Sequence, residues 1–297
     1  MNKVAGVTII GAGPAGIAAA IQLKRYGITP LLLEKNMLGG LLRNANLVEN
    51  YPGFPVGISG LHLTSLFEEQ LKNLSIQPIK AGVTRVKFED GLFLVETGTS
   101  VYYSQIIIVA SGTKPVQLTG FDIPASLQGK IYYQVVPLLQ ESGVVIAIVG
   151  AGDAAFDYAL NLAKTNQVII LNRGFAHKCL PLLWERAELD PNIRYIDNAC
   201  IESIYSNQEG GMMVQYKVIE GTSSFQVDYL VGAIGRVPNT DFLSDQVTEQ
   251  REELQSAGLL YFIGDVKNDI YRQASIAVGD GVRSAMQIFR TEKGLFS

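Results

Sequence analysis

Short apolar runs alternate with stretches of helical periodicity at the start of the chain. Val7–Ile10 is apolar, Ile17–Tyr26 carries alanines and other apolar residues at helical spacing, and Pro30–Glu34 is apolar up to its final carboxylate. Unbroken apolar runs of this length are typical of parallel strands that are buried on both faces. The order predicts a strand–helix–strand unit with a parallel sheet.

The same pattern starts again in the middle of the chain. Val144–Val149 is a second apolar run, Phe156–Lys164 has helical spacing, and Val168–Leu171 is apolar again. Elsewhere the pattern predicts helices over Ser59–Leu74 and Ala274–Phe289, and strands within Val83–Val109, Ile193–Ile196, Met213–Ile219, Tyr229–Ile234 and Leu259–Ile263. The polar stretch Asp241–Glu253 is expected to be a loop or a surface helix.

The repeated unit defines the expected fold class and domains. We expect an α/β protein with two Rossmann-like dinucleotide-binding domains of the three-layer ββα sandwich type, the second inserted into the first. The first domain is assigned to residues 1–114 and 240–297, and the second to residues 115–239. A chain of 297 residues that is 47% hydrophobic is long enough for two cores of ordinary size.

Charge and hydropathy narrow the class of partner. The formal net charge of −4 provides no basic field for nucleic acid or anionic membranes. No apolar run reaches about 18 residues without a glycine or a charge, so no membrane span is expected. The apolar N-terminal stretch is broken by glycines at positions 11, 13 and 16, which argues against a secretory signal, and we expect a cytoplasmic protein.

Cysteines and histidines are too few and too dispersed for a metal or disulfide framework. Cys179 and Cys200 are separated by 20 residues, so they form no Cys-x-x-Cys pair and are expected to be buried or partly buried thiols. His62 and His177 are far apart and have no metal-ligand spacing to another ligand. We expect no metal site.

The first predicted strand leads into a glycine-rich turn, Gly11-Ala12-Gly13-Pro14-Ala15-Gly16. Gly11 permits the tight turn, Gly13 lets the backbone approach a pyrophosphate, and Gly16 allows close packing of helix on strand. Glu34 lies 23 residues after Gly11, where a carboxylate accepts hydrogen bonds from a ribose hydroxyl. Together these residues predict a dinucleotide site, to which Pro14, Ala15 and Lys35 also belong.

The second predicted strand leads into Gly150-Ala151-Gly152-Asp153-Ala154-Ala155, in which Ala155 replaces the third glycine. Asn172 stands where Glu34 stands in the first unit, and Arg173, His177 and Lys178 follow it. A basic cluster at this place favours the 2′-phosphate of NADPH over NADH. The alternative is a solvated basic loop at a strand end.

The order and spacing of the motifs resemble the low-molecular-weight thioredoxin reductase family over nearly the whole chain. The glycine motifs alone would suit any flavoprotein with two dinucleotide sites, whereas the Glu-Asn-Tyr-Pro-Gly and Tyr-Arg-Gln-Ala blocks are more specific. The matching segments are Gly11–Gly16, Gly39–Gly40, Val48–Gly53, Ala110–Gly112, Gly150–Ala155, Ala233–Gly235, Pro238–Thr240, Gly264–Asp265 and Ile270–Ala274.

The resemblance implies FAD on the first domain, NADPH rather than NADH on the second, and a homodimer. It implies that Asp265 holds the ribitol of FAD, although such a residue also occurs simply as a turn residue after a strand. Asp157 falls where the family has a glutamate near the nicotinamide, and a solvated helix carboxylate is the alternative. Implied neighbours of FAD are Gly40, Leu41, Asn50, Ala110, Ser111, Gly112, Gly264, Gln273 and Ala274.

The chain departs from the family at the redox dithiol. Thioredoxin reductases carry Cys-Ala-Thr-Cys before the second glycine turn, and an ungapped count places Tyr133 and Val136 at the two cysteine positions. Without two thiols, electrons cannot leave through an intramolecular disulfide. Tyr133 is a candidate to stack on the flavin or to donate a hydrogen bond to it, and the alternative is a packing tyrosine.

Two further departures concern the nucleotide loop and the C-terminal part. The family's His-Arg-Arg-x-x-x-Arg phosphate site corresponds to Asn172–Lys178 here, so Lys178 stands in place of the last arginine. The lysine ammonium is a point charge, whereas the planar arginine guanidinium can make two parallel hydrogen bonds to a phosphate. The interval between Asn239 and Gly264 is short, so a hairpin that many relatives have there is expected to be missing.

The resulting hypothesis is an FAD-dependent oxidoreductase that takes a hydride from NAD(P)H and passes electrons to a ferredoxin- or flavodoxin-type carrier. It resembles the thioredoxin-reductase-like ferredoxin or flavodoxin NADP reductases, although these extend further beyond the last helix than the eight residues that follow Phe289. A second hypothesis is an FAD-binding electron-transfer or assembly subunit that has a degenerate nicotinamide site and works with a partner enzyme. A two-electron reductase or oxidase of a small substrate is the third.

Overall fold

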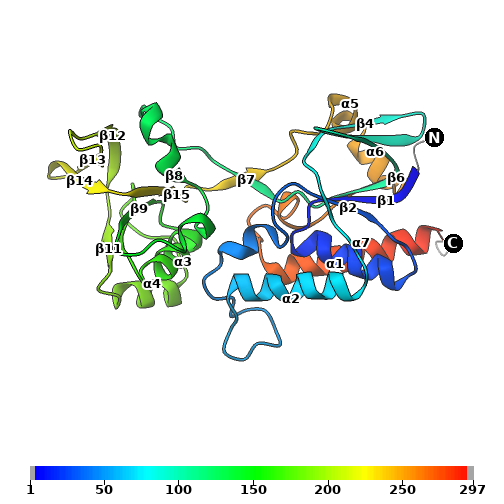
Figure 1. Cartoon of the computed structure of the whole chain (residues 1–297), viewed down its shortest axis with the longest axis horizontal. Coiled ribbons are helices and arrows are strands. Elements are labelled where there is room, and N and C mark those ends of the chain that lie inside the picture. Colours follow the sequence, from blue (N-terminus) through cyan, green and yellow to red (C-terminus); the bar gives the residue numbers. More distant parts are fainter. Residues whose placement is uncertain (1–3, 293–297) are drawn as a thin grey trace. The chain divides into compact units, whose positions relative to one another are not determined.

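The computed structural model describes residues 4–292, and they form two compact units (Figure 1). Among these residues, unit 1 contains 4–43, 49–114 and 237–292, and unit 2 contains 44–48 and 115–236. Residues 44–48, which the sequence assigned to the first domain, thus cluster with the second, and the C-terminal boundary lies at 237 instead of 240. The chain therefore passes between the units four times.

Unit 1 is built on a seven-stranded sheet in the order β3-β2-β1-β6-β5-β4, with β17 also pairing with β6. The parallel strands are β1 (Val4–Ile10), β2 (Leu31–Glu34), β3 (Ile79–Lys80), β6 (Val101–Val109) and β17 (Leu260–Phe262). The antiparallel strands are β4 (Val83–Glu89) and β5 (Leu92–Thr97). The last four residues of β1 and of β6 are fully buried, as expected of strands covered on both faces.

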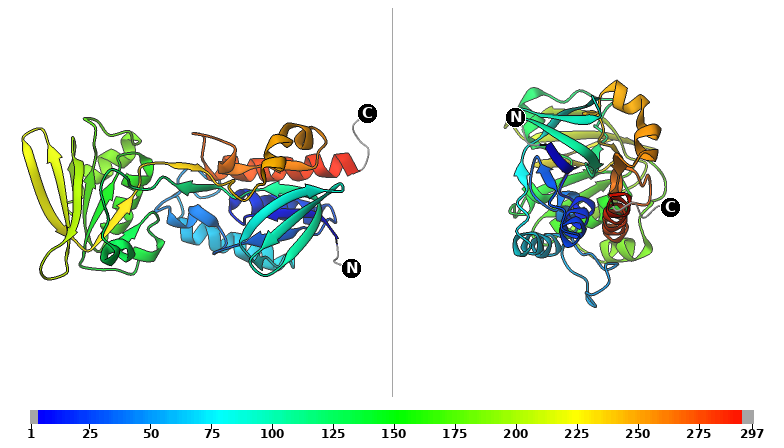
Figure 2. Two further views of the ribbon diagram at one scale, coloured as in Figure 1. Left: turned by 90° about the horizontal axis from the view of Figure 1, so that it is seen from above. Right: turned by 90° about the vertical axis from the view of Figure 1, so that its right-hand side faces the viewer.

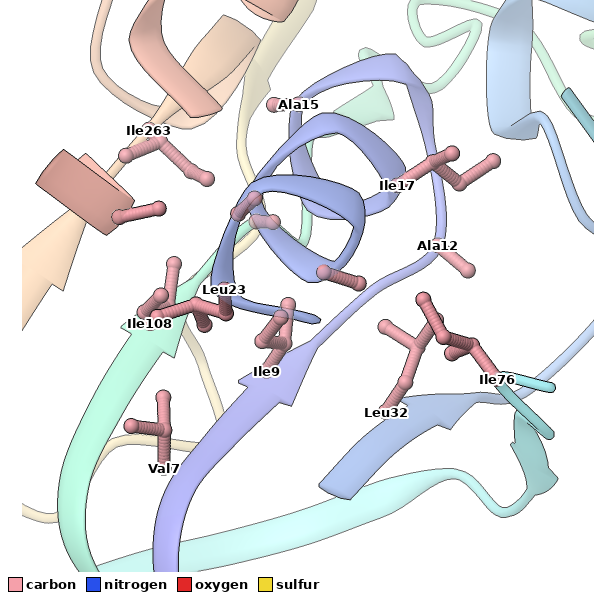
Figure 3. Packing of buried hydrophobic residues seen from close by; sticks show 14 of the residues in the cluster. Val7, Ile9, Ala12, Ala15, Ile17, Leu23, Leu32, Ile76, Ile108 and Ile263 are labelled. Carbon is pink, nitrogen blue, oxygen red and sulfur yellow. The ribbon is translucent and has the colours of Figure 1, made fainter. Parts of the chain in front are cut away.

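Helices pack against one face of the parallel strands. These are α1 (Pro14–Arg25), α2 (Gly60–Asn73) and α7 (Ala274–Glu292), and α1 and α7 lie side by side (Figure 2, blue and red). Figure 3 shows the core under α1, in which the side chains of Ile9 and Ile108 point from the strands toward Leu23 of the helix. The apolar residues of α1 are buried against the strands in this core, and this packing places the N-terminus of α1 at the end of β1.

The opposite side of the same sheet forms a second core. It joins the strand residues Ile107 and Val109 to Phe93 of the antiparallel hairpin and to Val247 and Leu254. The last two come from α5 (Asp245–Glu249) and α6 (Arg251–Ser256). The stretch predicted to be a loop or a surface helix is therefore two short helices that each bury one apolar side chain in this core, and none of the described strands lies between residues 239 and 259.

Unit 2 repeats the parallel sheet on a smaller scale. Its five strands follow the order β11-β10-β9-β15-β8 and are β8 (Ile131–Tyr132), β9 (Val145–Val149), β10 (Gln167–Leu171), β11 (Ile193–Ile196) and β15 (Tyr229–Gly232). Because side chains alternate along a strand, Ile146 and Ile148 of β9 pack toward α3 (Asp153–Leu162) and α4 (Pro181–Glu188). Ala147 packs on the other side.

That other side is covered by a three-stranded antiparallel sheet. It consists of β12 (Cys200–Ser206), β13 (Met212–Val218) and β14 (Gly221–Val227), of which only β13 was predicted. Met212 and Val214 of this sheet share a core with Ala147. Unit 2 is thus a sheet–sheet–helix sandwich.

The remaining elements are short. β7 (Thr113–Pro115) and β16 (Arg236–Pro238) form a two-stranded sheet at the boundaries between the units. The 3-10 helices are η1 (Gly40–Asn44), η2 (Ala125–Lys130), η3 (Val136–Leu138) and η4 (Gly264–Val266). None of the helices within residues 4–292 has the length and apolar character that a bilayer crossing requires.

Candidate functional site

The glycine turn of unit 1 has the geometry that the sequence predicted for a phosphate loop. Gly11 has φ +105°, and a Cβ on it would lie 2.4 Å from the carbonyl oxygen of Ala110. A Cβ on Gly16 would lie 1.9 Å from the carbonyl oxygen of Gly11, whereas a Cβ on Gly13 would meet nothing within 4 Å. Two glycines therefore permit packing, and the third leaves open space at the N-terminus of α1, where backbone N–H groups can bind phosphate.

A cleft of about 270 Å³ lies at the carboxyl ends of β1 and β2. Its lining includes Gly11, Glu34, Lys35 and Ser111 from the predicted set. The other lining residues are Ile10, Leu33, Ala81, Val83, Thr84, Asn239, Asp241 and Phe242. Of these, Ile10 and Leu33 directly precede the predicted residues Gly11 and Glu34, whereas the others were not predicted because β4, the residues just before it and the segment after β16 reach the cleft only through the tertiary fold.

Glu34 is held at this cleft by backbone donors. Its Oε2 accepts a hydrogen bond from the Ala12 N–H at 2.7 Å, and its Oε1 accepts from the Asn36 N–H at 2.9 Å. Each carboxylate oxygen can accept a second hydrogen bond. The orientation is therefore fixed while capacity for ribose hydroxyls remains.

The Gly39-Gly40 segment lies against the phosphate loop. The Gly39 N–H donates to the Ala12 carbonyl at 2.8 Å, and a Cβ on Gly40 would come within 3.4 Å of the Gly13 Cα. Leu41 follows in η1 and is partly buried. Of the two residues named from the resemblance, Gly40 thus lies against the glycine turn, and Leu41 comes directly after it.

The structure also brings together residues that are distant in the sequence. Asn50 Nδ2 donates to Gln273 Oε1 at 2.9 Å, and Ser275 Oγ donates to the Asn50 carbonyl at 3.2 Å, just where α7 begins at Ala274. After β6, Ser111 Oγ donates to the Asn239 carbonyl at 2.6 Å.

Three further predicted positions lie in turns of unit 1. Gly112, which has φ +64°, accepts through its carbonyl a hydrogen bond from the Asn239 N–H at 3.0 Å. Gly264 and Asp265 form the turn η4, and Gly264 packs against Ala15 of α1. Asp265 therefore lies close to the start of the helix that follows the phosphate loop.

The glycine turn of unit 2 repeats the first in detail. Gly150 has φ +131°, and a Cβ on it would lie 2.3 Å from the carbonyl oxygen of Ala233, as Gly11 lies against Ala110. A Cβ on Gly152 would meet nothing within 4 Å, and Ala155 is fully buried. Asp153 and Ala154, both exposed, begin α3.

The loop after β10 is organised by one buried amide. Asn172 Nδ2 donates to the Ala176 carbonyl at 3.0 Å and to the Tyr195 hydroxyl at 2.8 Å, and its Oδ1 accepts from the Gly174 N–H at 3.0 Å. The Asn172 side chain therefore shapes the loop from within. Arg173 and Lys178 are exposed, and a direct contact of any of the three with a nucleotide stays a prediction.

An aromatic group, which sequence reasoning missed, fixes the other end of this loop. The His177 ring stacks on Trp184 with a centroid distance of 4.1 Å, and Phe156 and Tyr195 contact the indole. These side chains come from three different elements and a loop, so no local sequence pattern predicts the cluster. Beside it, the Lys178 N–H donates to the Ala151 carbonyl at 2.7 Å, which ties the loop to the glycine turn.

Tyr133 is integrated into the packing of unit 2. Its hydroxyl accepts a hydrogen bond from the Leu118 N–H at 3.0 Å, and its ring lies so close to Gly232 that a Cβ there would be 2.6 Å from Tyr133 Cε1. At the second cysteine position of the family, the Val136 N–H donates to Asn44 Oδ1 at 3.2 Å. These contacts favour the packing role over the catalytic one.

Asp157 is a buried carboxylate on α3 that binds the segment 44–48. Its Oδ2 accepts from the Asn46 N–H at 2.9 Å, and the Leu47 backbone is a further donor. Burial raises the pKa of Asp157 to about 6, although these N–H groups and the Lys164 ammonium act in the opposite direction. The carboxylate therefore has partners in unit 2, and its predicted place beside a nicotinamide stays untested.

Comparison with known proteins identifies the group to which this architecture belongs. Residues 5–281 match the family described as pyridine nucleotide-disulphide oxidoreductase. The chain belongs to this family. The two glycine turns, which have matching geometry and each join a parallel strand to a helix, agree with this assignment to the family.

Members with similar sequences cover the whole chain. Thioredoxin reductase from Chlamydia trachomatis is 28% identical, over 96% of this chain and 98% of its own length. A 34.2 kDa protein in a rubredoxin operon of Clostridium pasteurianum is also 28% identical, over 96% of each chain. The crystal structure of Lactococcus lactis thioredoxin reductase matches with a TM-score of 0.84 at 26% identity and covers 97% of this chain and 99% of that one. The chain thus has the two-domain Rossmann-type fold of thioredoxin reductases.

Proposed function

We propose that the protein is an FAD-dependent oxidoreductase that takes a hydride from NADPH and passes electrons to an external acceptor without a redox-active disulfide. One observation carries the second half of this proposal. The two positions of the family dithiol hold Tyr133, whose hydroxyl is bound by the Leu118 N–H, and Val136, whose N–H is bound by Asn44. A packed tyrosine and a valine cannot relay electrons by thiol–disulfide exchange.

The two cysteines of the chain do not replace that dithiol. Cys179 is buried, and burial raises the pKa of its thiol, which disfavours the nucleophilic thiolate. Cys200 is exposed and begins β12. A buried thiol and an exposed one on another element do not form the Cys-x-x-Cys pair that the family's dithiol relay uses.

The fit of unit 1 to FAD supports the cofactor assignment. Gly13 leaves room for a pyrophosphate, Glu34 is aimed at the cleft with acceptor capacity to spare, and Asp265 lies in a turn beside the phosphate-loop helix. FAD bound there would supply an acceptor for hydride and a donor of electrons. The protein residues hold the cofactor and orient it.

Unit 2 is the proposed site of the nicotinamide dinucleotide. Its glycine turn leaves Gly152 open to a pyrophosphate, and Arg173 and Lys178 present two exposed positive charges at the end of β10. Positive charge at this place favours the 2′-phosphate of NADPH over the bare ribose of NADH.

The proposed acceptor is a redox protein of the ferredoxin or flavodoxin type. Loss of the dithiol leaves reduced flavin to donate directly, which suits a carrier that docks on the protein. The relative encoded in a rubredoxin operon makes rubredoxin a further carrier to include. Homodimerisation and a cytoplasmic location remain predictions.

Anaerobic mixing with NADPH, and separately with NADH, tests the proposal. We expect the visible band of the oxidised flavin to bleach with NADPH faster than with NADH, and addition of ferredoxin, flavodoxin or rubredoxin to restore it. An Arg173→Ala variant should lose the preference for NADPH because one phosphate partner is removed. If neither nucleotide bleaches the flavin, the proposal fails.

The internal use of Asn172 favours one alternative. Since both N–H groups of this amide donate within unit 2, to the Ala176 carbonyl and to the Tyr195 hydroxyl, the residue at the ribose-binding position has no side-chain donor left for a nucleotide. An FAD-binding electron-transfer or assembly subunit with a degenerate nicotinamide site would have such a loop. In that case the flavin would be reduced by a partner enzyme and by neither nucleotide.

A further inference from the structure

The turn that carries Asp265 has no freedom to shift along α1. Gly264 is buried at φ +70°, and a Cβ on it would lie 2.8 Å from the Ala15 Cβ and 3.6 Å from the Ala277 Cβ. The turn therefore passes between the first turn of α1 and the N-terminal half of α7. Any residue that holds this turn also determines where Asp265 stands.

One carboxylate on α7, that of Asp280, accepts hydrogen bonds from both sides of this turn. Asp280 Oδ2 accepts a hydrogen bond from the Gly264 N–H at 3.1 Å and another from Asn268 Nδ2 at 2.6 Å. Its Oδ1 lies 3.7 Å from Lys267 Nζ. The side chain of Asp280 is only 11% exposed, so these hydrogen bonds are shielded from competing water.

Asp280 is itself fixed relative to the phosphate loop. The next residue, Gly281, packs so tightly on α1 that a Cβ on it would lie 2.2 Å from the Ala15 carbonyl oxygen and 2.8 Å from the Ala19 nitrogen. Asp280 thus ties the turn of Asp265 to α7 at the point where α7 packs on α1, the helix that follows the phosphate loop.

We propose that Asp280 is a positioning residue for FAD, which sets Asp265 at the distance from the phosphate loop that the cofactor requires. The inference rests on the proposed function, since it assumes that unit 1 binds FAD. Asp280 makes no contact with the cofactor in this proposal. It acts through the backbone of Gly264 and the side chain of Asn268, which donate to the same oxygen, and its negative charge strengthens both hydrogen bonds.

The variant Asp280→Asn tests the charge with little change in shape. An amide oxygen in the place of Oδ2 can still accept from both donors, but both hydrogen bonds lose their charge assistance, and the amide NH2 group faces the Lys267 ammonium. We expect the dissociation constant of FAD, measured by titration of the apoprotein, to rise about tenfold, the effect of weakening both hydrogen bonds and losing the ion pair. The apoprotein should keep its circular dichroism spectrum.

A double variant and a matched control separate positioning from general stability. Asp280→Asn combined with Asn268→Ala completes a double-mutant cycle, and because the two side chains share one hydrogen bond, the loss of FAD affinity in the double variant should be smaller than the sum of the losses in the two single variants. Asp228→Asn is the matched control because Asp228 Oδ2 also accepts a backbone N–H, that of Val145 at 2.9 Å, but in unit 2. This control should lower the thermal midpoint of the apoprotein without weakening FAD binding.

The outcomes distinguish this inference from the proposed function. A wild-type protein that does not bind FAD overturns both. Wild-type binding together with unchanged affinity in Asp280→Asn overturns the inference alone, and so does an equal loss of affinity in Asp228→Asn. Weakened binding in Asp280→Asn that is less than additive with the weakening in Asn268→Ala supports it.

Discussion

At the scale of single residues, Asp157 shows how a buried carboxylate depends on its protonation. Its pKa of about 6 means that the folded state holds the proton more tightly than the unfolded chain, where the value is about 3.8. The stability that protonation provides is fully present below the unfolded pKa and is lost as the pH rises through 6. The ionised carboxylate therefore costs stability at neutral pH.

The variant Asp157→Asn should remove that cost. Its amide oxygen can still accept from the Asn46 N–H, but it carries no charge, so at pH 8 we expect it to be roughly 1–3 kcal/mol more stable than the wild type. Unfolding of the apoprotein in urea at pH 5 and pH 8 measures this, and the wild type alone should lose stability between the two. Lower stability of the variant at pH 8 would mean that Lys164 and the N–H groups outweigh burial.

Site residues differ in how far sequence alone can reveal them. Gly11 and Gly150 were predicted because a tight strand-to-helix turn excludes a Cβ, which is a local requirement. The contacts of Asn172 were not predictable, since its partner Tyr195 comes from another strand of the sheet. Asp280 gave no signal either, because nothing in its helix indicates that it reaches back to Gly264.

At the scale of elements, the contact between α1 and α7 depends on one position. A Cβ on Gly281 would lie 2.2 Å from backbone oxygen of Ala15, and backbone cannot move aside as a flexible side chain can. Gly281→Ala should therefore separate the helices and destabilise the protein by about 1–3 kcal/mol. The ratio of flavin to protein absorbance should fall as the phosphate loop and the Asp265 turn move apart.

Gly279 of the same helix provides the matched control. A Cβ on it would meet nothing within 4 Å, and the residue is exposed. Gly279→Ala should be neutral or stabilising by up to about 1 kcal/mol, since alanine favours helix over glycine. Thermal unfolding of both variants makes the comparison, and equal behaviour of the two would contradict the tight contact.

The elements that sequence reasoning missed are those with weak patterns. β14 reads Gly221–Val227, a largely polar and exposed edge strand in which Val227 alone is fully buried, so it lacks the alternation that identifies a strand. α5 and α6, where a loop or a surface helix was expected, have one buried residue each, Val247 and Leu254, too few for a helical stripe. The longer parallel strands, by contrast, are mainly apolar and were predicted within a few residues of their ends, whereas the two-residue parallel strands β3 and β8 were not predicted.

At the scale of the whole molecule, the repeat was predictable and the course of the chain between the units was not. Residues 44–48 belong to unit 2 because Asn44 binds the Val135 and Val136 N–H groups and Asp157 binds the Asn46 N–H. Such contacts arise between segments more than ninety positions apart. A motif defines its own turn, whereas the assignment of a connecting segment depends on partners that only the fold supplies.

The complete molecule should transfer electrons without any thiol. In a double variant, Cys179→Ala with Cys200→Ser, the buried thiol becomes a smaller apolar group, which removes its contact with His177 Nδ1, and the exposed thiol becomes a hydroxyl. We expect bleaching by NADPH and reduction of the carrier protein to proceed at the wild-type rates, measured anaerobically in the same preparation. Alkylation of the wild type with N-ethylmaleimide should be equally without effect, because Cys200 is accessible but not on the electron path. Retained bleaching with lost carrier reduction would instead reveal a thiol relay, within one chain or between two copies. The protein would then use disulfide chemistry although its sequence lacks the family's Cys-x-x-Cys pair.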